Sequence, residues 1–463
     1  MNKILIIFIM ISSILYAKKD FYYSYINPDL TQISDEQKQK IINGNGKLDT
    51  IRRYLKEGQL GLALKEIEIM KHNNKIEILT SDILLLNSRI LYNLDTKKRA
   101  LEALDILEVA VNESKINQNN LLEAYELLVL LNIRINKIKE AEYYAKVIAT
   151  SFDDPVSKIH GKIALAQIHI KKREYRTAIK ILKQELVEAT NLETATIIAD
   201  ELYDALILNK EKEEAYTLSK KVLEKNIDYY ANDSYKALKK VNKLLAAKMP
   251  EFAINIINRL LENSKDPKSI KNFKFILANT YMDLAGYEKK YLPMAKEIYK
   301  DLIQSQEDNP YFKRSKMYLD EIIMREGKFD PQMIAAKYSG FESMQYKAMM
   351  QELLNAIDDE KYEQVIRMKK VYSGIYKEIL NRYGYESIDQ IYTIVNFKML
   401  QYYLRNEQCE QLNTVIKELT DETLLSIIED DNATDNLFNC MQELPENRVY
   451  LIAKNVYSQS LNP

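Results

Sequence analysis

Residues 161–186 read GKIALAQIHIKKREYRTAIKILKQEL, and this stretch decides the fold. Its pattern predicts two short helices joined by a turn at residues 172–174, with Tyr175 at the start of the second helix. Ala178 and Leu182 then lie four residues apart on one face of that helix. Because so narrow an apolar stripe cannot stabilise a short helix alone, the unit needs similar neighbours on both sides.

The same unit recurs along the chain. Further copies occupy residues 51–70, 202–222, 241–260 and, with a longer turn, 277–302. The equivalent alanines of four successive copies are separated by 37, 37 and 38 residues, by subtraction of their numbers: Ala141, Ala178, Ala215 and Ala253. A fixed period of this length is typical of a helical solenoid.

The repeat resembles the tetratricopeptide repeat (TPR) family from about residue 47 to residue 463. Three features carry the resemblance: a small residue in the first helix, a turn ending in Gly-x-Tyr or its equivalent, and an alanine four residues before an aromatic or aliphatic residue. The chain departs from the family in having no Trp and a spacing above the common one of about 34 residues. The resemblance implies an all-α fold, a right-handed α-solenoid of antiparallel helix pairs, and binding of other proteins.

The N-terminal residues 1–17 are typical of a secretory signal peptide. Lys3 precedes the apolar run 4–16, and Ala17 is a small residue suited to cleavage. The run is short for a membrane span, although an uncleaved anchor is the alternative. We therefore expect a periplasmic protein with no membrane span after signal cleavage.

Three further ranges follow the leader. Residues 18–46 are expected to form an N-terminal strap and a short helix, which the Asn-Gly-Asn-Gly run at 43–46 should break. Residues 47–340 are expected to form the TPR-like solenoid. Residues 341–463, where the match weakens, should continue it as degenerate helical repeats. The Met- and Tyr-rich character of this part is interpreted as core, with an adaptable binding face as the alternative.

Several helix starts are marked by a capping side chain followed by Pro, which favours the first helical position. These pairs are Asp154-Pro155, Asp266-Pro267, Asn309-Pro310 and Asp330-Pro331.

Composition and motifs argue against several classes of function. The formal net charge is −1, so the chain has no basic field to hold nucleic acid. The histidines (His72, His160 and His169) are not spaced as a metal-binding pair, and no phosphate-binding loop or nucleophile motif is found. We expect no enzyme activity, no metal and no cofactor. A wall-cleaving enzyme would need a compact catalytic domain that these residues do not supply.

The two cysteines, Cys409 and Cys440, are 31 residues apart, close to one repeat. Export would permit a disulfide between them. Two free buried thiols are the alternative, because spacing in sequence does not fix geometry.

Polar residues of the first helices are the candidates for protein binding, because in solenoids of this kind these helices line the concave face. By alignment of the repeats, the candidates are Arg52, Gln167, Lys171, Asp200, Asp204, Asn242 and Asn279. Ordinary solvated positions are the alternative reading for each of them.

The leader, the Trp-free composition, the segment FYYSYINPDL at 21–30 and the long array together resemble the exported TPR proteins of the Campylobacterota, in particular the paralysed-flagellum protein A group. This resemblance implies a structural part of the flagellar motor: a spoke that links ring components, helps to position stators, and has motor disk or stator-ring proteins as partners. A periplasmic adaptor for envelope assembly or cell-wall synthesis is the alternative. Because no polar capping helix follows Leu461-Asn462-Pro463, we expect either that the last repeat docks on a partner or that this is the front part of a longer product.

Overall fold

The computed structural model describes residues 34–73, 77–304, 309–406, 408–416 and 440. It contains two compact units, of which unit 1 ends at Asn263 and unit 2 begins at Ser264. The predicted signal peptide and most of the predicted strap lie outside the described residues, as does the C-terminal end of the chain.

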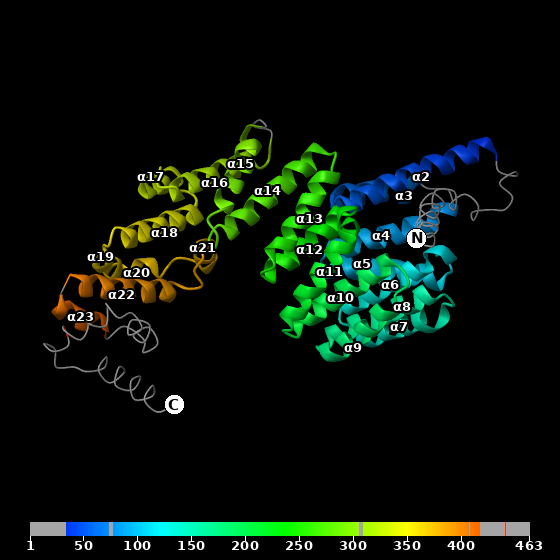
Figure 1. Ribbon diagram of the computed structural model, residues 1–463. Coiled ribbons are helices and arrows are strands. Elements are labelled where there is room, and N and C mark those ends of the chain that lie inside the picture. The colour runs from blue at the N-terminus through cyan, green and yellow to red at the C-terminus, as the bar shows by residue number, and fades with distance from the viewer. Residues whose placement is uncertain (1–33, 74–76, 305–308, 407, 417–439, 441–463) are drawn as a thin grey trace, which may run out of the picture. The chain divides into compact units, whose positions relative to one another are not determined.

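Unit 1 is a stack of consecutive antiparallel helix pairs (Figure 1). Its helices are α2 Asp35–Lys56, α3 Leu60–Asn73, η2 Glu77–Leu79, α4 Thr80–Asn93, α5 Lys97–Asn112, α6 Gln118–Arg134, α7 Ile138–Ser151, α8 Pro155–Lys171, α9 Tyr175–Glu188, α10 Leu192–Leu208, α11 Lys212–Ala231, α12 Ser234–Ala246 and α13 Pro250–Asn263. The described residues form an all-α solenoid, as the repeat pattern predicted.

The alanines that repeat in the sequence occupy equivalent buried positions in successive helix pairs. Ala141, Ala178, Ala215 and Ala253 each lie in the second helix of a pair and are fully buried. Alanine at this position lets the neighbouring helices approach closely, which a longer side chain would prevent.

The turns within the pairs repeat just as regularly. Asn136, Arg173, Lys210 and Lys248 all have positive φ, between 60° and 68°, at the end of a first helix. In each case the next backbone N–H bonds to a carbonyl five residues back, as Glu174 does to His169 at 2.9 Å. This arrangement satisfies carbonyl groups at the helix end and reverses the chain direction within three residues.

The predicted break at residues 43–46 is wrong, because α2 continues through it without interruption. Each glycine costs about 1 kcal/mol in a helix. Burial of Leu48 and Ile51, which are both fully covered, contributes roughly 1.5–3 kcal/mol each and outweighs that cost. The boundary predicted after residue 46 therefore falls inside a helix.

Three of the four predicted helix starts are confirmed. Asp154, Asp266 and Asp330 cap α8, α14 and α17, each accepting a hydrogen bond from a backbone N–H of the first turn. The prediction for Asn309 is wrong, since α16 begins only at Phe312. The Asn309 side chain accepts a bond from the Tyr311 N–H at 3.1 Å and donates to the Leu302 carbonyl of α15 at 2.9 Å.

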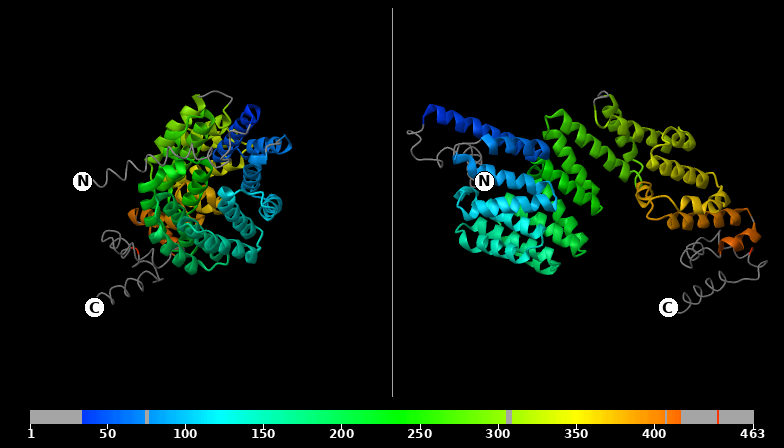
Figure 2. Two further views of the ribbon diagram at one scale, coloured as in Figure 1. Left: turned by 90° about the vertical axis from the view of Figure 1, so that its right-hand side faces the viewer. Right: turned by 180° about the vertical axis from the view of Figure 1, so that it is seen from behind.

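The first helices of unit 1 form one continuous inner surface. Each of α2, α4, α6 and α8 contacts the next first helix of the series. The series then returns on itself, because α12 packs against α2, as the views in Figures 1 and 2 also show. Unit 1 is therefore a closed turn of the solenoid, with the polar candidates on α8 and α10 on its inner side.

Unit 2 contains long helices interspersed with short ones. They are α14 Pro267–Leu284, α15 Tyr291–Gln304, α16 Phe312–Arg325, α17 Pro331–Lys337, α18 Glu342–Asp358, α19 Tyr362–Arg367, α20 Lys369–Tyr372, α21 Lys377–Arg382, α22 Ile388–Arg405 and α23 Cys409–Ile416. The compact units meet at 263/264, whereas the sequence placed a change of character after residue 340. None of the described helices combines the length and the apolar character that a bilayer span requires.

The Met- and Tyr-rich part of unit 2 is mainly core, as interpreted from the sequence. Met344, Met350, Tyr362 and Tyr372 are buried, and the last three pack into one cluster with α22. Tyr376 differs, being 47% exposed. Its hydroxyl donates to the Glu342 carboxylate at 2.7 Å.

Candidate functional site

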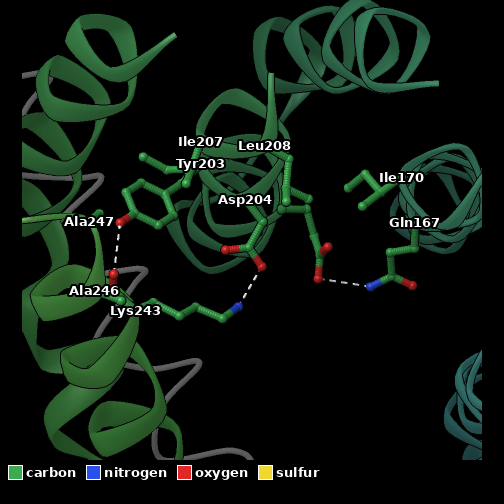
Figure 3. Close-up of a pocket in the computed structure, with 10 residues that line it drawn as sticks. Gln167, Ile170, Tyr203, Asp204, Ile207, Leu208, Lys243, Ala246 and Ala247 are labelled. Carbon is green, nitrogen blue, oxygen red and sulfur yellow. Dashed lines mark hydrogen bonds and ion pairs between the residues drawn. The ribbon is translucent and has the colours of Figure 1, made fainter. Parts of the chain in front are cut away.

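A pocket of about 370 Å³ lies on the inner surface of unit 1, between α8, α10 and α12 (Figure 3). We call it the unit 1 pocket. It is lined by Gln167, Ile170, Glu201, Tyr203, Asp204, Ile207, Leu208, Lys243, Ala246 and Ala247. Leu208 is 49% exposed, so the pocket has an apolar wall that is open to solvent. All of its lining residues come from first helices or the turn that follows one.

The pocket exists because α10 and α12 are held apart. The intervening helix α11 is kinked at Asn226, whose φ of −150° and ψ of 45° are not helical. The Asn226 amide donates to the Thr196 hydroxyl at 2.7 Å, and beyond the kink the Tyr230 hydroxyl donates to Asp200 at 2.6 Å. Tyr230 is 1% exposed and wedges the end of α11 against α10. The backbones of the two first helices therefore do not pack closely, and side chains bridge the space between them.

Five polar side chains define the mouth of the pocket. The Gln167 amide donates to the Glu201 carboxylate at 2.8 Å, and the Lys243 ammonium pairs with Asp204, as the dashed lines in Figure 3 show. The Tyr203 hydroxyl donates to the Lys243 carbonyl at 3.4 Å. These bonds cross from α8 to α10 and from α10 to α12, so they fix the width of the opening.

Glu201 has an unusual protonation equilibrium. Burial, together with repulsion from Asp204, raises the pKa of Glu201 to about 7, and the bond from Gln167 and the charge of Lys243 offset only part of this. The carboxyl group is therefore partly protonated near neutral pH. Tyr92 of α4 belongs to the same inner surface: burial raises its pKa, and Glu201 adds to that shift.

Two of the residues predicted from sequence meet in the pocket, namely Gln167 and Asp204. Asp200 instead accepts hydrogen bonds from the Tyr230 hydroxyl and the Lys240 ammonium, the latter at 2.9 Å. It contributes to the packing of α11 and α12 on α10.

The other predicted residues are dispersed. Arg52 bridges Asp49 at 2.9 Å and Asp82 at 2.7 Å, and so ties α2 to α4. Lys171 and Asn242 are exposed. Asn279 lies in unit 2, where its side-chain oxygen accepts a bond from the Tyr299 hydroxyl at 2.9 Å.

Sequence reasoning missed Glu201 and Lys243. Glu201 precedes Asp204 by three residues and so shares a helix face with it, which is a signal the sequence does contain. Lys243 follows the selected Asn242 directly, and only the orientation of α12 shows that the lysine is the one facing the pocket.

Cys409 and Cys440 are joined by a disulfide, with their Cα atoms 5.0 Å apart. Within the part of the chain that the structure describes, no group of three or more His, Cys, Asp or Glu side chains could hold a metal ion.

A second polar cluster is buried in unit 2. The fully covered Glu321 carboxylate accepts bonds from Lys347 at 2.6 Å, Arg325 at 2.8 Å and Arg382 at 3.2 Å. Burial alone would raise the pKa of Glu321, but these three cations hold it well below its usual value. The cluster ties α16, α18 and α21 together, and we assign it to the stability of unit 2.

The comparisons with known proteins add a remote likeness. No protein-family model matches the chain, and no curated protein matches it. Among solved structures, the TPR domain of P58(IPK) is similar over 86% of this chain and 97% of that chain, with 13% sequence identity and a TM-score of 0.29. The chain's own helices and repeat period show a TPR-like array of helical repeats. Such an array is an architecture for protein–protein interaction.

Proposed function

We propose that the chain is a non-enzymatic scaffold that binds other proteins, and that the unit 1 pocket is where it does so. The observation that carries the proposal is the open apolar pocket on the inner surface of unit 1, ringed by Gln167, Glu201, Asp204 and Lys243. Apolar walls bury side chains of a partner, and a few fixed polar groups give orientation and specificity.

We further propose that the scaffold acts in the periplasm as a structural component of the flagellar motor, a spoke that links ring components and supports stator positioning. Support comes from the sequence: the leader at 1–17, the Trp-free composition, the aromatic segment at 21–30 and the long repeat array. Its partners would be proteins of the motor disk or stator ring.

Deletion of the gene in its native host tests this role. Cells should build filaments but fail to swim, and the wild-type gene supplied in trans should restore swimming. Normal swimming would overturn the motor role. In that case, a defect in envelope assembly or cell-wall synthesis would point to a periplasmic adaptor instead.

A further inference from the structure

The three carboxylates on the inner face of α10 are not equivalent. Asp204 is paired with Lys243, and Asp200 is paired with Lys240, so α12 supplies one lysine to each. Glu201 accepts its hydrogen bond from the neutral amide of Gln167. Among the described residues, no lysine, arginine or histidine forms a direct ion pair with Glu201, although the charge of Lys243, which pairs with Asp204, lowers the pKa of Glu201 from a distance. Because Lys243 is directly bonded to Asp204, the Glu201 carboxylate has no cation of its own.

Apolar side chains next to Glu201 could hold the stem of a basic side chain. Ile170, Ile207 and Leu208 line the same pocket, and Leu208 is 49% exposed. Lysine and arginine side chains carry an apolar stem below a charged head. A stem laid against these residues would bury apolar surface while its head reached the carboxylate.

We propose that the unit 1 pocket binds a lysine or arginine side chain of the partner protein, with its charged head on the Glu201 carboxylate and its stem against Ile170 and Leu208. This inference rests on the proposed function, because it names the chemistry of the partner for that pocket.

The protonation of Glu201 supports the inference. The pKa of Glu201 is raised to about 7 by burial and by Asp204. A cation within about 4–6 Å lowers the pKa of a carboxyl group, so a bound basic side chain would draw Glu201 into its charged form. In the free protein this charge costs stability, which a group serving only the fold would not be expected to do.

Two peptides that differ only in charge test the proposal. The probes are acetyl-Ala-Leu-Arg-Leu-Ala-amide and the same peptide with citrulline, an uncharged mimic, in place of arginine. Binding to the full chain is followed through the methyl NMR signals of Ile170, Ile207 and Leu208 at a pH above 7. The variants are Glu201→Gln and, as a matched control, Glu188→Gln, since Glu188 is exposed at the end of α9.

We expect the arginine peptide to shift these methyl signals and to bind at least about tenfold more tightly than the citrulline peptide. Glu201→Gln should abolish this preference, and Glu188→Gln should keep it. Equal binding of both peptides, or an unchanged preference in Glu201→Gln, would overturn the inference while leaving the scaffold function intact. An arginine peptide that does not shift the methyl signals would overturn it as well. The scaffold function has its own test in the deletion strain.

Discussion

The Tyr235 hydroxyl donates to the Asn93 carbonyl at 3.2 Å, although 142 residues separate the two in sequence. The ring of Tyr235 also lies 3.4 Å from the position that a Cβ would take on Gly58. Gly58 has a φ of 72° in the turn after α2, a backbone conformation that glycine adopts readily because it has no side chain. These contacts hold α12 against the start of the solenoid and close unit 1.

Loss of the Tyr235 contacts should open unit 1 at this point. Tyr235→Phe removes the hydrogen bond and should cost about 0.5–1.5 kcal/mol, while Tyr235→Ala also removes the ring and should cost more. Hydrogen exchange should accelerate in α2 to α4 and in α12. Tyr287→Ala, at a residue 60% exposed in unit 2, is the control and should leave exchange in α2 to α4 unchanged. If hydrogen exchange in these helices is as slow in Tyr235→Ala as in the wild type, the Tyr235 contacts do not stabilise the closure of unit 1.

Gly161 should be intolerant of any side chain. A Cβ at this position would lie 2.5 Å from the backbone nitrogen of Ala149, so α7 and α8 would have to separate. We expect Gly161→Ala to lower the free energy of unfolding by about 1–3 kcal/mol, measured by urea denaturation. Gly46→Ala in α2 is the matched control, because nothing lies within 4 Å of the new Cβ. That variant should be more stable by about 1 kcal/mol. A Gly161→Ala variant that gains stability as Gly46→Ala does would contradict the packing described here.

The raised pKa of Glu201 predicts a loss of stability as pH rises. Between the ordinary value of 4.5 and about 7, the folded chain keeps a proton that the unfolded chain has released. The free energy of unfolding should therefore fall across this window, by roughly 1–3 kcal/mol. Glu201→Gln should remove that contribution and be more stable than the wild type above pH 7. Chemical denaturation at several pH values measures both effects.

Other titratable and charged groups lie around Glu201 and also affect how stability changes with pH. They are Asp200, Asp204, Lys240 and Lys243 from α10 and α12, Tyr92 from α4 and Tyr229 from α11. Glu188→Gln is the control for a change of net charge. A difference between wild type and Glu201→Gln that does not vary with pH would contradict the raised pKa.

The buried cluster of unit 2 should depend on its one central carboxylate. Glu321→Gln leaves Arg325, Lys347 and Arg382 without their common partner and should destabilise unit 2 by about 3–5 kcal/mol. Glu378→Gln, at an exposed position of α21, should change stability little. Because the pKa of Glu321 is held below its usual value, its stabilising contribution is present above the unfolded pKa and is lost as pH falls below it. A Glu321→Gln variant as stable as the Glu378→Gln control would refute the assigned role.

The helix pairs were predictable because their determinants are local and repeated. An alanine every 37 or 38 residues is a steric requirement of the packing, and Ala178 and Ala215 meet it in full. The continuous helix α2 was not predictable in this way. The glycines at 44 and 46 locally disfavour a helix and so predict a break. Burial of Leu48 in the tertiary structure outweighs this preference, and the sequence near the glycines does not show that burial.

The pocket was only half predictable. Gln167 and Asp204 were identified because repeat alignment places them on the inner face. The space between α10 and α12 depends on the kink at Asn226, and that repeat is only one residue longer than its predecessors. Lys243 forms its direct ion pair with Asp204 and not with Glu201, and this depends on the orientation of α12, which the spacing in sequence does not determine.

The most direct test of the binding role is a photo-crosslink from inside the pocket. A photoreactive p-benzoylphenylalanine in place of Leu208 is compared with the same group in place of Val187, which is 84% exposed and does not line the pocket. In living cells of the native host, we predict a single reproducible crosslink from position 208 to a ring component of the flagellar motor, and none from position 187. If position 208 captures nothing, or if position 187 captures the same proteins equally well, the unit 1 pocket is not the binding site.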